Sequence, residues 1–416
     1  MDRYDIPNEP VQTQKRGPIR VSLGVLVICI LLTGVIIFSL TCAAVSSYYG
    51  RFPGLKKLQE IASLYEKNYI NDIDKDQLSE ILVQAYLYGT GDRFTAYYSA
   101  EEWAEQEASE SGNSVGIGVY VSATESDEIC IIKIMEGAGA DKAGLLSGDV
   151  VISIDGVNVA EVGYESASAL LKGEIGSQVT LGIRRGTETF TVDIVRSQYA
   201  AQTVFAETVM RGGNLYGLVQ ITEFLSVQTT FYQFKTAVDA LIEYGVQGLI
   251  FDVRNNLGGD VNAVLRMLDY LLPEGPLVHL YYADQIDPIT HYSDAGHIDI
   301  PMVVLVNEYS ASSAELFAAA IRDYEKAELV GIKTFGKGCG QRAIMLSDGS
   351  VVFITSFLYN PPYSDNYNEI GLFPDYEVEL TEKWQNTNLF LIPHEEDNQL
   401  IKAIDVLEGK VSDVQS

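Results

Sequence analysis

Residues that commonly bind metals or act as a neutral base are scarce in this chain. Its 416 residues include four cysteines and four histidines, and neither a Cys-x-x-Cys pair nor a His-Glu-x-x-His motif occurs. The sequence therefore gives no support for a zinc site, and we expect no metal and no organic cofactor. A Ser–His–Asp triad stays open, because the members of such triads assemble from distant positions in a chain.

The few cysteines do not form a disulfide framework. Cys29 and Cys42 lie in an uncharged apolar run, whereas Cys130 and Cys339 fall in segments of different character. A disulfide-stabilised fold needs several paired cysteines within one small domain, so we expect no disulfide here.

Positive charge is also scarce. The chain has 28 Lys and Arg against 57 Asp and Glu, which gives a formal net charge of −29. Such an acidic surface repels phosphate groups, so we expect neither nucleic acid nor anionic lipid as a partner. The apolar fraction of 47% supports real cores, and the length fits two or three domains.

One long apolar run is present near the N-terminus. Residues 21–45 carry no charge over 25 positions, enough for a helix to cross a bilayer core of roughly 30 Å. Lys15, Arg16 and Arg20 precede this run. By the positive-inside rule, residues 1–20 form a cytoplasmic tail, and the chain after one span lies outside the cell membrane.

A cleaved signal peptide is the alternative, with a cleavable site near Thr41–Ala43. The apolar core of a signal peptide usually has about 7–15 residues. The run here is longer, which favours an uncleaved anchor over residues 21–45.

The rest of the chain changes character several times. Residues 51–112 show helical periodicity, although the acidic, Ser-rich stretch at 101–113 is typical of a linker. Residues 113–196 predict a small β-barrel with two short helices and a hairpin. Strand and helix patterns alternate over 200–385, which predicts an α/β domain with a mainly parallel sheet. Residues 386–416 predict a helical C-terminal tail.

The segment 113–196 resembles a PDZ domain. The motif that carries the likeness is a Gly-Ile-Gly at Gly116–Gly118 followed by AGADKAGLLSGDVVISIDG at 138–156. The resemblance implies that Val115, Gly116, Ile117 and Gly118 offer backbone N–H groups to the carboxylate of a peptide C-terminus. The alternative is that these glycines only form a tight turn.

The segment GIKTFGKGCGQ at 331–341 has the glycines and lysine of a phosphate-binding loop. Such a loop needs Ser or Thr directly after its lysine and a helix that begins there. Here Gly338 follows Lys337, and the next residues predict a strand. We therefore reject nucleotide binding at this loop.

Lys337 can instead act as a general base. The ordinary lysine pKa of about 10.4 is too high for work near neutrality, but desolvation in a weakly charged setting lowers it. Candidate nucleophiles are Ser310, Ser312 and Ser313, which lie between a buried-type strand and a helix. A nucleophile at such a turn is exposed and faces the positive end of the helix dipole.

Two features of these motifs have purely structural explanations. Ser312 and Glu315 form a Ser-x-x-Glu capping box, so Ser312 can simply cap its helix. Gly258 and Gly259, in FDVRNNLGGD, can aim N–H groups at an oxyanion or merely turn the chain.

Taken together, the motifs resemble those of the C-terminal processing peptidases, also called tail-specific proteases. The resemblance runs from about residue 55 to residue 410 and rests on the motifs GDRFTAYYS, DVRNNLGG, VLVNEYSASSAE, VGIKTFGKGCGQ and IGLFPD. It implies an α/β fold in which a PDZ domain precedes a crotonase-like serine endopeptidase domain. It also implies protein or peptide substrates with accessible C-termini, and a homo-oligomer is left open.

The resemblance assigns roles to individual residues. Ser312 matches the nucleophile, Lys337 matches the base 25 residues later, and Gln341 matches the residue that holds the lysine amine. The implied oxyanion donors are the N–H of Ser313 and that of Gly258 or Gly259.

This chain departs from the family pattern at a few positions. Leu257 stands where proline is usual, and the usual SASASE is replaced by SASSAE around Ser312. Arg254 and Asp323 match positions that we interpret as structural supports. A catalytically silent surface scaffold that holds protein tails is the alternative function, and the joint presence of serine, lysine and glutamine argues against it.

Overall fold

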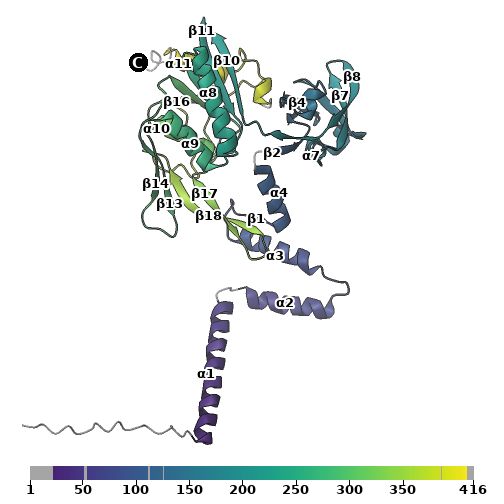
Figure 1. Ribbon diagram of the computed structural model, residues 1–416, viewed down its shortest axis with the longest axis vertical. Coiled ribbons are helices and arrows are strands. Elements are labelled where there is room, and N and C mark those ends of the chain that lie inside the picture. Colours follow the sequence, from purple (N-terminus) through teal and green to yellow (C-terminus); the bar gives the residue numbers. More distant parts are fainter. Residues whose placement is uncertain (1–21, 51–53, 111–112, 125, 386, 410–416) are drawn as a thin grey trace, which may run out of the picture. The chain divides into compact units, whose positions relative to one another are not determined.

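The computed structural model describes residues 22–50, 54–110, 113–124, 126–385 and 387–409 (Figure 1). The chain divides into two compact units, of which the first ends at Ser79 and the second begins at Glu80. The expected cytoplasmic tail, residues 1–20, lies outside the described residues.

The first unit is helical. Helix α1 (Leu23–Gly50) contains the apolar run, α2 covers Leu55–Asn68, and α3 (Lys75–Gly89) continues into the second unit. Within α1, Leu23–Ala43 is long and apolar enough to cross a membrane, and its side chains are exposed. Length and composition fit either a membrane anchor or a signal sequence.

A six-stranded sheet forms the centre of the second unit. Strand β10 pairs antiparallel with β11, and the neighbouring pairs that follow are parallel, in the order β10-β11-β12-β15-β16-β19. The strands are β10 (Val204–Arg211), β11 (Asn214–Ile221), β12 (Leu249–Asp252), β15 (Met302–Val306), β16 (Ala327–Gly331) and β19 (Tyr376–Glu377). The expected mainly parallel sheet is therefore confirmed.

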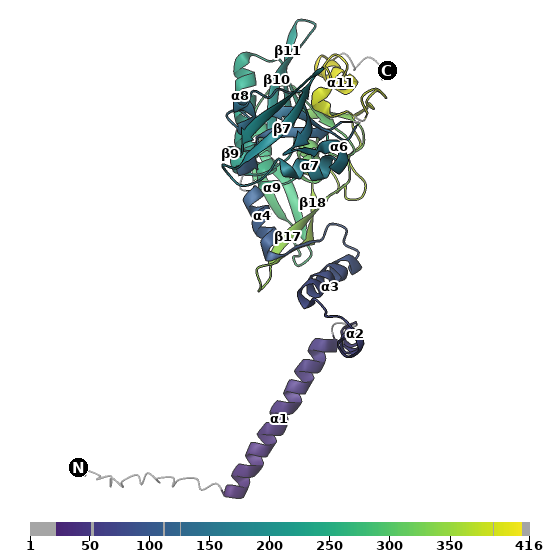
Figure 2. The ribbon, with the colours of Figure 1, turned by 90° about the vertical axis from the view of Figure 1, so that its right-hand side faces the viewer.

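Helices cover both faces of this sheet (Figures 1 and 2). One face packs against α8, α9 and α10, and the other face packs against α11. The helical segments are η1 (Val227–Phe231), α8 (Tyr232–Tyr244), α9 (Val261–Leu271), α10 (Ser313–Asp323), η2 (Leu389–Leu391) and α11 (Asn398–Leu407). Because every β12 residue is buried, this strand is one continuous apolar run that ends on Asp252.

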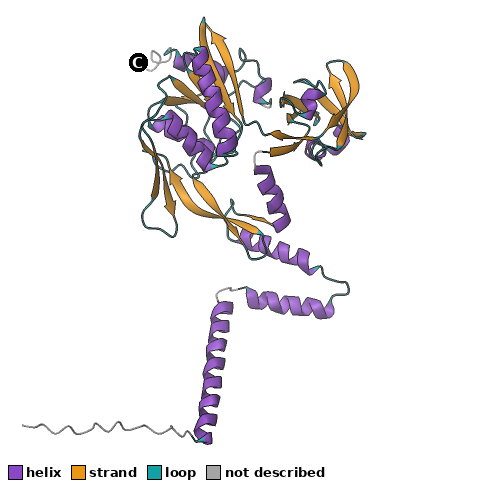
Figure 3. Cartoon of the chain, viewed as in Figure 1, coloured by secondary structure: helices purple, strands orange, loops and turns teal. Residues whose placement is uncertain are grey.

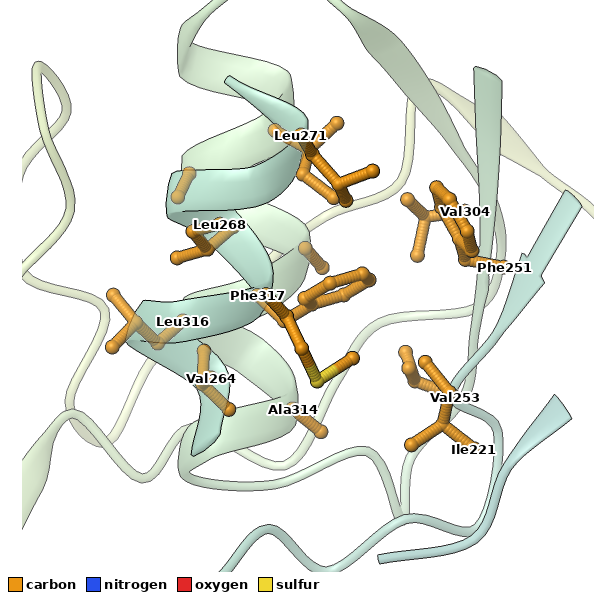
Figure 4. Close-up of a cluster of buried hydrophobic side chains, with 14 of the residues drawn as sticks. Ile221, Phe251, Val253, Val264, Leu268, Leu271, Val304, Ala314, Leu316 and Phe317 are labelled. Carbon is orange, nitrogen blue, oxygen red and sulfur yellow. The ribbon is translucent and has the colours of Figure 1, made fainter. Parts of the chain in front are cut away.

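Alternate side chains of the strands enter the two cores. Phe251 and Val304 point into the larger core, where Phe317 of α10 meets Phe251 edge to face at 5.6 Å between ring centroids (Figure 4). Ile250 and Val303 point to the opposite face, against α11. This packing fixes the start of α10 relative to the ends of β12 and β15, where the candidate site lies.

A second, antiparallel sheet flanks the first. Its order is β1-β18-β13-β14, and β17 also pairs with β18 through a hairpin that turns at Asp348-Gly349. Its strands are β1 (Ala96–Tyr98), β13 (Gly275–Tyr282), β14 (Ile289–Ser293), β17 (Cys339–Met345) and β18 (Val351–Asn360). The strands β1, β13 and β14 were not predicted from the sequence.

Residues 113–200 form a small β-sheet domain with short helices (Figure 3). The sheet order is β3-β4-β5-β7-β8, with β6 paired to β5, and β2 pairs separately with β9. Its elements are β2 (Asn113–Gly116), β3 (Val119–Ala123), β4 (Ile129–Ile134), α5 (Gly139–Lys142), β5 (Val150–Ile154), β6 (Val157–Asn158), α6 (Val159–Val162), α7 (Tyr164–Leu170), β7 (Gln178–Arg185), β8 (Glu188–Val195) and β9 (Ser197–Ala200).

The expected linker at 101–113 is wrong for most of its length. Helix α4 covers Ala100–Glu110. Ser99 and Glu102 form reciprocal bonds at its start: Ser99 N–H donates to Glu102 Oε2 at 2.8 Å, and Glu102 N–H donates to Ser99 Oγ at 3.3 Å. Trp103 then packs on Phe353 of β18 at 5.6 Å. The linker was predicted from the acidic, Ser-rich composition alone. That prediction overlooked the capping box at Ser99 and Glu102 and the aromatic contact of Trp103.

Candidate active site

Ser312 lies where the chain turns from β15 into α10, and its backbone is strained. Its φ and ψ are 57° and −120°, whereas a residue that only caps a helix has extended, negative-φ geometry. A non-glycine residue in this region costs roughly 1–3 kcal/mol and persists only where the surrounding structure enforces it. Such strain is concentrated at functional sites, so the backbone of Ser312 argues against capping as its only role.

The three candidate serines differ in access. Ser310 is buried and donates its hydroxyl to the Val253 carbonyl at 2.7 Å. Ser313 is also buried and donates its hydroxyl to the Gly259 carbonyl at 2.8 Å. The Ser312 side chain is partly exposed. Of these three, Ser312 is the one that a substrate can reach.

Glu315 joins the serine turn to the lysine loop. Its Oε2 accepts the N–H of Ser312 at 3.0 Å and the N–H of Lys337 at 2.8 Å. Its Oε1 accepts the hydroxyl of Thr334 at 2.5 Å and the N–H of Gly336 at 2.7 Å. The expected capping box is present, and the same buried carboxylate also holds the backbone of the candidate base.

Burial raises the pKa of Glu315, and the hydrogen bonds to its carboxylate oppose that rise. An ionised carboxylate accepts hydrogen bonds at both oxygens, which is what four converging donors require.

The lysine loop passes through narrow space. Gly336 has φ of +91°, and a Cβ there would lie 2.9 Å from the N of Gly371. A Cβ on Gly338 would lie 2.7 Å from Asn366 Oδ1. The hydroxyl of Tyr359 also donates to the Lys337 carbonyl. The glycines beside Lys337 are therefore explained by close packing of the loop, with no need for a bound phosphate.

The Lys337 side chain is partly buried, with its Nζ 4.8 Å from the centroid of the Phe94 ring. Burial lowers the pKa of Lys337, against opposing effects of Cys339, Asp92 and Glu315. A depressed pKa is the property that a lysine base needs.

Gln341 lies on β17 directly opposite Thr355 of β18. Its Nε2 donates to Thr355 Oγ1 at 3.2 Å and lies 3.9 Å from Cys339 Sγ. Among the hydrogen bonds of the described residues, none joins Lys337 Nζ to Ser312 or to Gln341. The role of Gln341 in holding the lysine amine therefore stays a prediction.

The glycine turn after β12 lies against the serine turn. A Cβ on Gly258 would stand 2.8 Å from Ser312 Cβ and 3.0 Å from Ser313 N. The Gly258 N–H donates to Asn256 Oδ1 at 2.8 Å. In the described part of the chain, no hydrogen bond involves the N–H of Gly259 or of Ser313. Two amides beside the serine are thus available to an oxyanion.

Arg254 belongs to a buried ionic cluster behind this turn. Its guanidinium donates to Asp252 at 2.7 Å, to Asp397 at 2.8 Å and to Gln399 at 2.8 Å. Asp397 is the N-cap of α11, so the cluster ties the C-terminal helix to the end of β12. Asp323 likewise accepts N–H bonds from Tyr363 and Ser364.

The small β domain contains a groove of about 350 Å³. Gly116, Ile117 and Gly118 line it, whereas Val115 lies in β2 opposite Gln198 of β9. Gly118 has φ of +79°, and a Cβ there would come within 2.1 Å of Ala138 Cβ. Lys172 also lines the groove, and the sequence analysis did not single it out.

Two residues near the start of the second unit also contact residues of the candidate site. Neither was given a role from the sequence. Phe94 contacts Lys337, and Asp92 accepts hydrogen bonds from Thr355. Only the motif GDRFTAYYS pointed to this segment, through the family resemblance and not through any pattern of its own.

The fold and the site define a class: a serine peptidase of α/β fold joined to a PDZ domain. The profile of Peptidase family S41 matches residues 215–378, and that of the PDZ domain matches residues 115–195. The carboxyl-terminal-processing protease of a Picosynechococcus species is 30% identical over 292 residues, covering 69% of this chain and 70% of the relative. The chain belongs to the carboxyl-terminal processing proteases of family S41, as its motifs predicted, and is a serine-type endopeptidase.

Other comparisons agree. The carboxy-terminal processing protease CtpA of Bacillus subtilis is 29% identical over 332 residues, covering 79% of this chain and 70% of the relative. A solved S41 protease of Bacteroides fragilis superposes with a TM-score of 0.56 at 18% identity, over 78% of this chain and 90% of that one. The latter likeness confirms the predicted fold class.

Proposed function

We propose that this protease is anchored in the membrane, binds protein C-termini through its PDZ domain, and cleaves with Ser312 as nucleophile and Lys337 as base. The observation that carries the catalytic part is the strained, accessible Ser312, held through Glu315 to the loop of a partly buried lysine.

In the first half of the reaction, Ser312 Oγ attacks the scissile carbonyl carbon while its proton passes to Lys337 Nζ. Lys337 then gives this proton to the leaving nitrogen as the C–N bond breaks, which leaves an acyl ester on Ser312. In the second half, water attacks the ester and gives a proton to Lys337. That proton returns to Ser312 Oγ when the ester bond breaks.

The negative charge that develops on the carbonyl oxygen needs fixed N–H donors. We propose the N–H of Ser313 and a donor from the Gly258–Gly259 pair. The engagement of the Gly258 N–H with Asn256 favours Gly259 for the second donor. Gln341 would hold the lysine amine, a contact that can form when substrate is bound, because catalytic hydrogen bonds often tighten only in the complex.

Recognition of the substrate end is assigned to the groove of the PDZ domain. Its walls are mostly apolar, with Ile117, Val119 and Leu171 among them, and Lys172 adds a positive charge to its lining. Backbone N–H groups near Gly116–Gly118 would bind the terminal carboxylate, and the apolar walls would accept an apolar last side chain.

Membrane anchoring is assigned to α1. Its apolar part, Leu23–Ala43, has the length of one span. The basic residues Lys15, Arg16 and Arg20 precede it, which favours a cytoplasmic N-terminus and an external protease.

The experiment is a comparison of Ser312→Ala with the unmodified full-length chain. We expect cleavage of a peptide substrate to be abolished while the thermal unfolding midpoint changes little. Loss of a helix cap alone would cost about 0.5–2 kcal/mol of stability and leave cleavage intact. Ser126→Ala, at an exposed serine of the PDZ domain, is the matched control and should cleave normally. A Ser312→Ala chain that still cleaves would refute the assignment.

A further inference from the structure

We propose that Asp92 is a positioning residue, which sets the orientation of the Gln341 side-chain amide through the hydroxyl of Thr355. The inference rests on the proposed role of Gln341 in the reaction and extends it to a residue far away in the sequence.

The segment that carries Asp92 is docked on the strand behind the site. Strand β1 pairs antiparallel with β18, with Ala96 opposite Phe353 and Tyr98 opposite Val351. Just before β1, Thr95 donates its hydroxyl to the Phe353 carbonyl at 2.7 Å. Asp92 is thereby brought next to Thr355, although the two are 263 residues apart.

The Asp92 carboxylate holds Thr355 at two points. Its Oδ1 accepts the Thr355 hydroxyl at 3.0 Å, and its Oδ2 accepts the Thr355 N–H at 3.2 Å. Oδ1 also accepts the N–H of Phe94 at 3.0 Å, which closes a turn within the segment. The side chain and the backbone of Thr355 are therefore both fixed by one acidic group.

The polarity of this contact decides how Gln341 lies. An ionised carboxylate can only accept, so the single hydroxyl proton of Thr355 is committed to Asp92. The oxygen of Thr355 can then only accept from Gln341, which must present its NH₂ group, in line with the 3.2 Å bond from Nε2. The Gln341 carbonyl oxygen is left to face elsewhere, free to accept from a protonated lysine.

The position of Gln341 in the strand supports the same conclusion. The β17–β18 register shifts between Gly340 and Gln341, which places Gln341 directly opposite Thr355. The Sγ of Cys339, at 3.9 Å from Nε2, is a weak acceptor on the NH₂ side. Phe94, two residues after Asp92, contacts Lys337 Nζ. One short segment thus contacts the lysine directly and the glutamine through Thr355.

The first test uses Thr355, with substitutions that keep or remove its hydroxyl. Thr355→Val has nearly the same shape but cannot relay a hydrogen bond, whereas Thr355→Ser can. We expect Thr355→Val to lower kcat about ten- to a hundredfold with little change in KM, the size of loss that misplacement of a catalytic group produces. Thr355→Ser should retain most of kcat. Equal kcat for the two variants would overturn the proposal.

The second test is a double-mutant cycle in the full-length chain. Asp92→Asn can donate as well as accept, so it allows the Thr355 hydroxyl to reverse. We expect Asp92→Asn to lower kcat about ten- to a hundredfold on its own and to have almost no further effect in a Gln341→Ala chain. Glu101→Gln, which removes an exposed carboxylate in the first turn of α4, should leave kcat unchanged. If turnover of Gln341→Ala is too slow to follow, the rate of fluorophosphonate labelling of Ser312 replaces it.

The outcomes separate this proposal from the proposed mechanism. If Asp92→Asn lowers activity by the same factor with and without Gln341, Asp92 acts by holding the segment alone and the inference is wrong, while the mechanism stands. If Gln341→Ala itself turns over at the unmodified rate, the proposed role of Gln341 is refuted, and the inference about Asp92 is refuted with it.

Discussion

At the scale of single residues, the proposed chemistry depends on keeping Lys337 uncharged at a pH where an ordinary lysine is protonated. Burial lowers the pKa of Lys337 below that of an ordinary lysine, although Cys339, Asp92 and Glu315 oppose the shift. A lowered pKa means that the neutral base is populated at a lower pH than for a free lysine. The rate of peptide cleavage should therefore rise with pH through an apparent pKa below that of a free lysine.

Two substitutions test this assignment. Lys337→Ala removes the base and Lys337→Arg keeps a cation that stays protonated, so both should abolish cleavage. The measurement is kcat across pH 6 to 9 for the unmodified chain and single-pH assays for the variants. An active Lys337→Arg chain, or a rate that falls steadily over this range, would be incompatible with a lysine base.

The glycine turn offers a second prediction. A Cβ on Gly259, where φ is +133°, would lie 2.2 Å from the Phe224 carbonyl oxygen. Gly259→Ala should therefore displace the turn beside Ser312 and lose both cleavage and thermal stability. Gly176→Ala is the matched control, because φ is +83° there and no atom lies within 4 Å of the added Cβ. It should cost about 1–2 kcal/mol of strain and leave cleavage intact. Similar losses in both variants would show that strain alone explains the effect.

Individual residues differ in how far the sequence could predict them. Ser312 and Lys337 were accessible to sequence reasoning because each lies in a short local motif. From the sequence, Glu315 could be predicted only as a capping residue, because its bond to Lys337 joins the first turn of α10 to a loop 22 residues later. Asp92 and Thr355 were not accessible, because their contact arises from the pairing of β1 with β18. Leu257, where proline is usual, is 70% exposed, and nothing in the structure explains the substitution.

At the scale of elements, the alternation of strands and helices predicted the parallel sheet, because buried parallel strands are continuous apolar runs. The same reasoning missed β13 and β14, which belong to the flanking sheet and are half-exposed along much of their length. It also mistook α4 for a linker, because polarity outweighed a capping box that starts at Ser99. Elements fixed mainly by partners elsewhere in the chain leave a weak local pattern.

The groove of the PDZ domain supports a prediction about substrate ends. Amidation of a peptide's C-terminus removes its charge and leaves the scissile bond untouched. Loss of charge-assisted hydrogen bonds should weaken binding by roughly 1.5–3 kcal/mol, about tenfold or more. The measurement compares KM and kcat for free and amidated peptides with the full-length chain.

A variant locates this effect in the groove. Lys172→Met should reduce the difference in KM between the free and the amidated peptide. Lys142→Met, at an exposed lysine outside the groove, should leave that difference unchanged. Equal cleavage of both peptides by the unmodified chain would mean that the groove does not bind C-termini.

At the scale of the whole molecule, one apolar helix precedes a strongly acidic chain. The sequence predicted a span, since 25 uncharged residues suffice, and the length of the run favoured an anchor. The helix itself fits either an anchor or a signal sequence. With intact cells, we expect added protease to digest the chain after about residue 50 and to leave a tag at residue 1 protected. Digestion of that tag would reverse the proposed orientation, and release of the soluble chain would identify a cleaved signal.

The central claim is that Ser312 is the nucleophile and that Lys337 activates it. The most direct measurement is to treat the full-length chain with a fluorophosphonate and to locate the adduct by mass spectrometry. We predict an adduct on Ser312, absent from Ser310 and Ser313, that forms faster as pH rises and is lost in Lys337→Ala. An active protease without an adduct on Ser312, or an undiminished adduct in Lys337→Ala, would contradict the account.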